Sequence, residues 1–466
     1  MRRRIVMTAS QHATLLDHFS RRNREQLAFL FAGVSQSPRH LDLLVRQVRV
    51  VGTSELAGRG RRGLELSDGT RREVFSAAAV AGHAVIEAHS HPGAGATVTF
   101  SPSDNAGEAA FVPYVRGKLP GMPYGAMVWS EEGLDARIWL PDARRPLPTD
   151  IVRVIGPRIV SIAPTSSRSA SACAEEAARY DRQIRAFGPE GQARLGQMRV
   201  AIVGLGGIGS HVAQQLAYLG VTDFLLIDDD QVEAVNLNRL IGAFPGDERA
   251  PKVHIARRMI RSILPEARVT ALRASLMSTQ ALEALRGVDL IVGCTDTDGS
   301  RFVLNEFAKV YLLPYVDCGT GIEVEDGKIA RLGGHVAVVL PDGPCLLCAQ
   351  EIDRSIAQQE LETAQERELR RQHGYVTGAD APEPSVISLN GVVASLAVGE
   401  VIALVTGWRS PVAYQTYHGD GRTRALPVRR VSRDPNCIVC HSKLGQGDAA
   451  KIERYVRKGL PRDLPG

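Results

Sequence analysis

Two pairs of cysteines have the clearest metal-ligand spacing in this sequence. Cys345 and Cys348 form one C-x-x-C pair, and Cys437 and Cys440 form a second. Four thiolates suit a closed tetrahedral zinc, which has no open position and is therefore structural. The chain has seven cysteines. An odd total with paired spacing suits metal binding in a reducing cytoplasm better than a disulfide framework.

A second candidate metal site lies in the stretch EAHSHPGAGATVTFSPSD. His89 and His91 alternate on one face of an expected strand, and Asp104 follows after a loop. Two imidazoles and one carboxylate leave a fourth zinc position open for water. Zinc lowers the pKa of that water from about 15.7 to roughly 7, which supplies hydroxide at neutral pH. The set predicts a catalytic zinc, and a polar loop beside a sheet is the alternative.

The run GLGGIG stands between an expected strand, RVAIVG, and an expected helix. Its glycines are Gly204, Gly206, Gly207 and Gly209. Such glycines let backbone amides approach a phosphate, and the helix N-terminus adds positive potential. Asp228 ends the next strand, where a carboxylate can accept hydrogen bonds from ribose hydroxyls. Taken alone, these features favour an NAD-dependent oxidoreductase.

Further motifs around this loop change that interpretation. They are YDRQ with Arg182, VNLNRL with Asn236 and Arg239, APKVHIA with Lys252, and CTDTDGSR with Asp296 and Arg301. With these motifs in this order, residues 179–445 resemble the ThiF/MoeB and ubiquitin-activating-enzyme superfamily. The resemblance implies ATP-dependent adenylation of the C-terminal carboxylate of a ubiquitin-like or sulfur-carrier protein.

The resemblance also implies a role for each matching residue. The nucleotide loop is Gly204, Gly206, Gly207 and Gly209, the ribose ligand is Asp228, the second acid of the D-x-D motif is Asp230, the phosphate contacts are Asn236, Arg239 and Lys252, and the magnesium ligand is Asp296. Arg182 would reach the nucleotide of a neighbouring subunit, which implies a homodimer. The family carries a structural zinc at positions that match the four cysteines. Cations and a metal would stabilise charge on the phosphoryl oxygens as pyrophosphate leaves.

Members of this superfamily that pass the protein onward as a thioester carry a cysteine after the first C-x-x-C pair. Residues 349–436 contain no cysteine. Release of a free adenylate to a partner, such as a conjugating enzyme, is therefore expected, and a hydroxyl acceptor in GYVTGADAPEPSVISL is a weaker alternative. Cys294 and Cys318 are expected to be packing residues.

The amino-terminal segment resembles the JAMM (MPN+) metalloprotease motif, H-S-H-P followed by S-x-x-D. These enzymes cleave peptide or isopeptide bonds next to ubiquitin-like proteins. The resemblance implies that His89, His91 and Asp104 bind zinc, that Ser101 helps to stabilise the oxyanion, and that Glu25 is the catalytic glutamate. The gap between His91 and Ser101 is a little longer than usual, which indicates a longer loop over the site.

Three other residues of this segment carry side chains that could take part in such chemistry. Glu87 is the rival base, because it shares a strand face with the two histidines, although a supporting carboxylate is the favoured interpretation. His40 and His83 have no comparable frame and are expected at the surface.

The pattern of elements predicts two domains. Residues 1–152 read as a mixed α+β domain of JAB/MPN type, and residues 153–178 as a linker that includes the Ser/Ala-rich run PTSSRSASACAEEAA. Strands alternate with helices over residues 179–445, which predicts an α/β fold with a doubly wound, Rossmann-like and mostly parallel sheet. Residues 446–466 are expected to be a tail.

Composition excludes several function classes. A net charge of +5 and only 5% aromatic residues give no sign of nucleic-acid binding. No run of eighteen apolar residues appears, so neither a transmembrane helix nor membrane association is expected, and the start MRRRIVMTASQH has no apolar run of a secretory signal. A cytoplasmic protein is expected.

Two interpretations of the whole chain stay open. In the first, adenylation of a ubiquitin-like protein is coupled to zinc-dependent processing or deconjugation of that protein by the first domain. In the second, the substrate is a sulfur-carrier protein activated for thiocarboxylate formation, and the first domain trims it or only docks it. The expected cofactors are ATP, magnesium and two zinc ions, one catalytic and one structural.

Overall fold

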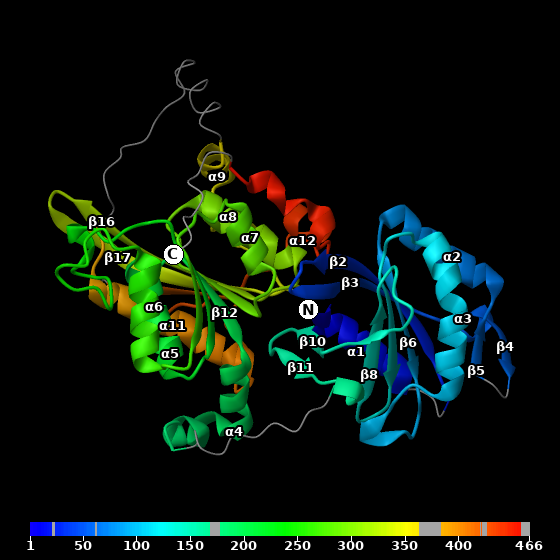
Figure 1. Ribbon diagram of the computed structural model, residues 1–466. Helices are drawn as coiled ribbons and strands as arrows, with labels where there is room; N and C mark the ends of the chain where they lie inside the picture. The colour runs from blue at the N-terminus through cyan, green and yellow to red at the C-terminus, as the bar shows by residue number, and fades with distance from the viewer. Residues whose placement is uncertain are drawn as a thin grey trace. The chain divides into compact units, whose positions relative to one another are not determined.

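The computed structural model describes residues 1–20, 24–60, 63–167, 178–362, 384–419, 421 and 426–457 (Figure 1). The chain divides into two compact units. Unit 1 comprises residues 1–173, 310–312 and 444–450, and unit 2 comprises residues 174–309, 313–443 and 451–466.

Unit 1 is built on a nine-stranded mixed sheet. Its strands are β1 (Arg2–Thr8), β2 (Leu27–Gln36), β3 (His40–Val50), β6 (Ala84–Ser90), β7 (Tyr124–Trp129), β8 (Leu134–Trp139), β9 (Leu147–Pro148), β10 (Ile151–Ile155) and β11 (Val160–Ile162), in the order β11-β10-β1-β3-β2-β6-β7-β8-β9. A separate hairpin pairs β4 (Leu56–Gly60) with β5 (Gly63–Leu66). The helices are α1 (Ala9–Ser20), α2 (Asp68–Ala81) and α3 (Pro102–Lys118).

Alternating side chains on β2 explain why helices cover both faces of this sheet. Phe29 and Phe31 pack in one core with residues of α2 and α3. Ala28 and Leu30 pack in the other core with residues of α1. Successive strand residues point to opposite faces, so a run of apolar residues on β2 requires a cover on each side. The same alternation on β6 directs His89 to the face that α2 and α3 cover.

Two observations in unit 1 bear on the sequence-based expectations. His40 is 5% exposed, and its ring nitrogens contact the hydroxyls of Ser35 and Ser37, so the expected surface position of His40 is wrong. The range 153–178 contains part of β10 and all of β11, and residues 168–177 lie outside the described residues. The predicted domain boundaries stay predictions.

Unit 2 is an α/β fold on a seven-stranded sheet. Its strands are β12 (Arg199–Val203), β13 (Asp223–Ile227), β14 (Arg268–Leu272), β15 (Leu290–Gly293), β16 (Tyr315–Glu325), β17 (Lys328–Val339) and β18 (Tyr414–His418), in the order β14-β13-β12-β15-β16-β17-β18. The pairs from β14 to β16 are parallel, and β17 and β18 extend the sheet in antiparallel fashion. The mostly parallel, Rossmann-type sheet is confirmed, with an antiparallel edge that the sequence did not predict.

Helices flank both faces of this sheet. They are α4 (Asp181–Gln197), α5 (Gly207–Tyr218), α6 (Lys252–Ile263), α7 (Thr279–Leu285), α8 (Asp298–Val310), α9 (Arg354–Glu360), α11 (Ile387–Thr406) and α12 (Ile438–Ser442). Figure 1 shows α5, α6 and α11 on one face and α7 and α8 on the other. Each helix between parallel strands crosses over the sheet, which is the doubly wound arrangement.

Helix α11 is long and apolar enough to cross a membrane by length and composition, and it is one such helix among the described residues. Most of its packing is against α5, β16, α4 and β17. Its one acidic residue, Glu400, is buried and accepts hydrogen bonds from Arg409, the Val412 amide and Gln415. These contacts are those of a core helix.

Candidate functional site

The predicted histidine and aspartate ligands of unit 1 meet at one point. His89 Nε2 lies 3.2 Å from His91 Nε2, and Asp104 lies 3.6 Å from His89 Nε2 and 3.3 Å from His91 Nε2. Three ligands placed about 2.05 Å from a tetrahedral zinc stand about 3.3 Å from one another. The three side chains therefore fit a zinc ion with a fourth position left for water.

The start of α3 fixes the position of Asp104. The Ser101 hydroxyl accepts a hydrogen bond from the Asp104 amide, and the Ser101 amide donates to the Asp104 carboxylate at 2.7 Å. This reciprocal capping box turns the first helical turn toward the histidines. Burial opposes ionisation, but hydrogen bonds from His89, His91 and Ser101 hold the pKa of Asp104 well below its usual range. The aspartate is thus anionic, as a metal ligand must be.

Two glutamates compete for the role of base beside these ligands. Glu25 Oε1 lies 3.9 Å from His91 Nε2, and its side chain is 42% exposed. Glu87 accepts a hydrogen bond from the Tyr124 hydroxyl at 3.2 Å, and burial raises the pKa of its carboxyl. Both line a cavity of about 430 Å³ that also borders His89 and Asp104. Glu25 lies beside the predicted ligand His91, and its role as the base stays a prediction.

The four paired cysteines of unit 2 form a cluster. Cys345 Sγ lies 3.8 Å from Cys348 Sγ and 3.6 Å from Cys437 Sγ, and Cys348 Sγ lies 3.7 Å from Cys440 Sγ. A tetrahedral zinc with Zn–S bonds of about 2.3 Å has sulfur–sulfur edges of about 3.8 Å. The cluster therefore fits a closed zinc site that joins the loop after β17 to α12.

A buried lysine lies near this cluster. Lys309 is fully buried, and its ammonium group donates to the carbonyls of Leu340, Pro341 and Gly343. Burial lowers the pKa of Lys309, and the nearby thiol groups of Cys440 and Cys345 oppose that shift. Four thiolates around one zinc carry a net negative charge. The Lys309 ammonium beside them offsets part of the free-energy cost of burying that charge.

The glycine loop of unit 2 lies where the order of the parallel strands reverses. Strand β12 pairs with β13 on one side and with β15 on the other. The connections that follow β12 and β15 therefore run toward opposite edges of the sheet. Ligands of such sheets bind outside the strand ends at this place. Gly204 has φ +86°, and a Cβ there would lie 2.5 Å from the Cys294 carbonyl oxygen. Only glycine permits this close approach of the two loops.

Asp228 and Lys252 lie on the loops next to the glycines. One Asp228 carboxylate oxygen accepts a hydrogen bond from the Leu205 amide at 2.6 Å, and the other accepts from the Asp230 amide at 2.8 Å. Burial raises the pKa of Asp228 to about 6. Lys252 begins α6 and forms an ion pair of 2.7 Å with Asp230. The D-x-D motif therefore joins the glycine loop to the predicted phosphate-binding lysine.

The other predicted nucleotide contacts are less tightly placed. Asn236 Oδ1 accepts a hydrogen bond from the Glu233 amide, and Arg239 Nη1 donates to the Val235 carbonyl and to Asn238. These contacts stay within the turn after β13. Arg182 is exposed on α4. Their contacts to a nucleotide, and the homodimer that Arg182 implies, stay predictions.

A cavity of about 800 Å³ opens beside the glycine loop. Its lining includes Ile208 of α5, Cys294 and Asp296 from the loop after β15, and the glycines at 319, 321, 333 and 334 on β16 and β17. At Gly321 an added Cβ would meet no atom within 4 Å, so this position on β16 borders open space. Cys318 is buried, as expected of a packing residue, whereas Cys294 is partly exposed and borders the cavity.

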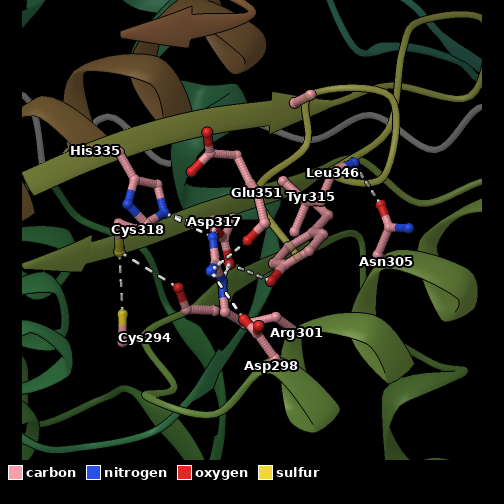
Figure 2. A network of polar contacts seen from close by, with 12 residues as sticks. Cys294, Asp298, Arg301, Asn305, Tyr315, Asp317, Cys318, His335, Leu346 and Glu351 are labelled. Carbon is pink, nitrogen blue, oxygen red and sulfur yellow. Dashed lines mark hydrogen bonds and ion pairs between the residues drawn. The ribbon is translucent and has the colours of Figure 1, made fainter. Parts of the chain in front are cut away.

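A buried polar network borders the same cavity, and sequence reasoning missed most of it (Figure 2). Asp317 is 1% exposed and accepts hydrogen bonds from Arg301 and from the Tyr315 hydroxyl. His335 Nε2 lies 2.9 Å from Asp317 Oδ2. Burial opposes ionisation of Asp317, but Arg301 and His335 hold the pKa of this carboxyl well below its usual range. A carboxylate inside the apolar run LLPYVDC was the available sequence signal.

The cysteine cluster makes a prediction about metal content. We expect one zinc per chain to be lost in Cys348→Ser, together with a marked fall in thermal stability, because three thiolates cannot close the site. Metal analysis by mass spectrometry and thermal unfolding measure both. Cys294→Ser is the matched control, since that thiol lies outside the cluster. An unchanged zinc content in Cys348→Ser would contradict the assignment.

Comparisons with known proteins bear on the same part of the chain. The model of the ThiF family matches residues 180–439. The SAMP-activating enzyme E1 of Haloferax volcanii is 34% identical over 172 residues, which are 36% of this chain and 60% of that protein. The sulfur carrier protein adenylyltransferase of Thermus thermophilus is 30% identical over 290 residues, which are 60% of this chain and 97% of that protein.

A third relative has a similar identity and coverage to the second. The molybdopterin-synthase adenylyltransferase of Escherichia coli is 30% identical over 270 residues, which are 57% of this chain and 97% of that protein. The family match spans more than half of the chain and includes the glycine loop, Asp228 and Asp296. The chain therefore belongs to the ThiF family.

Proposed function

We propose that unit 2 uses ATP to adenylate the C-terminal carboxylate of a small sulfur-carrier protein of the ubiquitin-like class. The observation that carries this proposal is the cavity of about 800 Å³ that runs from the glycine loop and Asp296 to a wall of glycines. Such a cavity suits an extended, glycine-ended tail whose carboxylate must reach a bound nucleotide. The names of the relatives from Thermus thermophilus and Escherichia coli agree with an adenylyltransferase.

The charges around the glycine loop suit this chemistry. The amides at the N-terminus of α5 face the position where phosphates would bind, and Lys252 begins α6 nearby. A carboxylate oxygen of the substrate attacks the α-phosphate, and pyrophosphate leaves with the bonding electrons. Magnesium, when bound, offsets charge on the phosphates, and the Asp296 carboxylate would hold it. The Lys252 ammonium would stabilise the negative charge that spreads over the phosphoryl oxygens.

The sulfur-carrier interpretation is favoured over protein tagging for two reasons. The relatives with nearly complete coverage are a sulfur carrier protein adenylyltransferase and a molybdopterin-synthase adenylyltransferase. Residues 349–436 also contain no cysteine that could carry the product as a thioester. A protein-tagging function would instead require transfer of the activated protein to a conjugating enzyme.

Adenylation predicts the behaviour of an Asp296 variant. With ATP, labelled pyrophosphate and a panel of purified sulfur-carrier proteins ending in glycine, the wild type is expected to catalyse pyrophosphate exchange. Asp296→Ala is expected to lower the exchange rate by about 10²-fold or more, because a metal ligand in the transition state is lost. Asp298→Ala is the neighbouring control, since Asp298 pairs with Arg301. Exchange that survives in Asp296→Ala would contradict the role of Asp296.

Asp228 predicts a pH dependence of nucleotide binding. Each of its oxygens already accepts one amide hydrogen bond and has a further lone pair for a ribose hydroxyl. The carboxyl is ionised above its pKa of about 6 and loses acceptor capacity below it. The Kd for ATP is therefore expected to rise as pH falls from 7 to 5, measured by calorimetry. Asp228→Asn should bind ATP more weakly and with a flat profile, and a wild-type profile that is already flat would refute the role.

We also propose a second function, a zinc-dependent peptidase of JAMM type in unit 1. It rests on the convergence of His89, His91 and Asp104, whose spacing fits a tetrahedral zinc, with Glu25 at 3.9 Å from His91. Zinc, when bound there, supplies an activated water. The Glu25 carboxylate would take a proton from that water and return it to the leaving amine. The Ser101 hydroxyl, at the N-terminus of α3, would face the oxyanion.

A cleavage assay separates this function from simple docking. Carrier proteins extended by a few residues beyond the terminal glycine are incubated with the wild type and with Glu25→Ala, and mass spectrometry follows the products. We expect the variant to cleave about 10²-fold or more slowly, because the proton-transfer group is gone. Glu132→Ala, an exposed glutamate of unit 1, is the control. Equal cleavage by Glu25→Ala would end the peptidase proposal, and one zinc per chain would favour docking.

A further inference from the structure

The acyl-adenylate that unit 2 would form needs a second nucleophile, and this step rests on the proposed adenylation. Residues 349–436 contain no cysteine, so that segment of the chain offers no thiol to take the acyl group. The nucleophile must then reach the acyl carbon inside the cavity of about 800 Å³. A thiol or hydrosulfide attacks as its anion, so a group that removes a proton there would accelerate the step.

His335 on β17 has the geometry of such a group. It borders the cavity, and its ring stacks against Tyr414 at 6.2 Å between centroids with 6° between the planes. Its Nε2 contacts Asp317 at 2.9 Å, and only that nitrogen carries dashed contacts in Figure 2. The other ring nitrogen, Nδ1, points away from Asp317. Stacking and the contact to Asp317 therefore fix the ring and leave Nδ1 for a ligand.

Asp317 has the charge needed to orient this ring. It is 1% exposed, and Arg301 and the Tyr315 hydroxyl hold it as an anion. An anionic carboxylate favours the tautomer with a hydrogen on Nε2, which leaves the lone pair on Nδ1. The same carboxylate stabilises the imidazolium that forms when Nδ1 takes a proton. This is the arrangement by which a buried aspartate supports a histidine base.

Arg301 gives His335 a second partner for the same nitrogen. Arg301 Nη2 lies 2.8 Å from His335 Nε2, and Arg301 is itself held by Asp317, Asp298 and the Glu351 carbonyl. A ring nitrogen carries either a hydrogen or a lone pair, so Nε2 donates to Asp317 or accepts from Arg301. The base role requires the tautomer in which Nε2 donates to Asp317, because only that tautomer leaves a lone pair on Nδ1.

The other titratable groups around the cavity are less suited to the task. Glu323 pairs with Arg331 at 3.6 Å. His418 is exposed, and its Nε2 contacts the Thr416 hydroxyl at 3.3 Å. Asp296 is the proposed magnesium ligand. Among the cavity-lining residues that the structure describes, His335 alone combines an imidazole with a buried carboxylate.

We propose that His335, oriented by Asp317, is the general base that activates a sulfur nucleophile for attack on the acyl-adenylate. Nδ1 takes the proton from the S–H group as the sulfur forms a bond to the acyl carbon. The bond from that carbon to the phosphate oxygen breaks, and AMP leaves with the electron pair. The products are the thio-acylated carrier, AMP and a protonated His335, which returns its proton to water. No oxidation or reduction is involved.

The test separates the two half-reactions of the full-length protein. A carrier protein that supports pyrophosphate exchange is adenylated in a single turnover, dithiothreitol is added as the thiol, and mass spectrometry follows the carrier thioester. His335→Gln keeps an amide able to donate to Asp317 but has no basic nitrogen. We expect its transfer rate to fall about 10²-fold, while pyrophosphate exchange falls less than about tenfold. His83→Gln, a partly exposed histidine of unit 1 outside this cavity, should transfer within about threefold of the wild type.

The pH profile gives a readout that a structural role would not change. With a histidine base taking the proton, the wild-type transfer rate should level off as the pH rises. In His335→Gln the rate should keep rising with the thiolate fraction. The inference is overturned if His335→Gln transfers as fast as the wild type, if its profile still levels off, if it loses exchange equally, or if His83→Gln is impaired as much. Absence of exchange in the wild type would instead overturn the proposed function itself.

Discussion

The close approach of two loops at the carboxyl ends of β12 and β15 is the constraint on which the rest of unit 2 depends. Gly204 has a left-handed backbone and lies against the Cys294 carbonyl, so any side chain there would force the strands apart. Gly207 is similarly restricted, because a Cβ would lie 2.1 Å from Asn390 Nδ2 on α11. These contacts bring the amides of α5 and the Asp296 loop to one edge of the sheet.

Charged residues lie on both sides of that edge of the sheet. Asp228 and Lys252 lie on the β13 side, where the glycine loop and the start of α6 meet. Arg301, Asp317 and His335 lie on the β16 side, where the cavity extends along the antiparallel strands. Asp317 is paired with Arg301 and His335, so its buried charge avoids the large cost of an isolated ion. Nucleotide chemistry and acyl chemistry would then use neighbouring parts of one cavity.

The two candidate metal centres differ in what holds them. The thiols of the four-cysteine cluster come from two chain segments separated by about ninety residues, as in the 92-residue spacing of Cys345 and Cys437. A closed site there would join those segments in place of a larger apolar core. In unit 1, β6 and the first turn of α3 already fix the ligands through a strand and a capping box. These local contacts orient the ligand side chains, so a fourth protein ligand is not needed to hold them in place.

The sequence by itself determined the alternating strands and helices around β12 to β15, the glycine loop, the cysteine spacing and the His-x-His motif. Each of these depends on local spacing, which a linear pattern records. The antiparallel strands β17 and β18, the burial of His40 and the pairing of Asp317 with His335 were decided only by tertiary structure. Their energies come from sheet pairing, burial and charge pairing that no local pattern reports. The cavity is lined by residues of β16, β17 and β18, which become neighbours only once the sheet has formed.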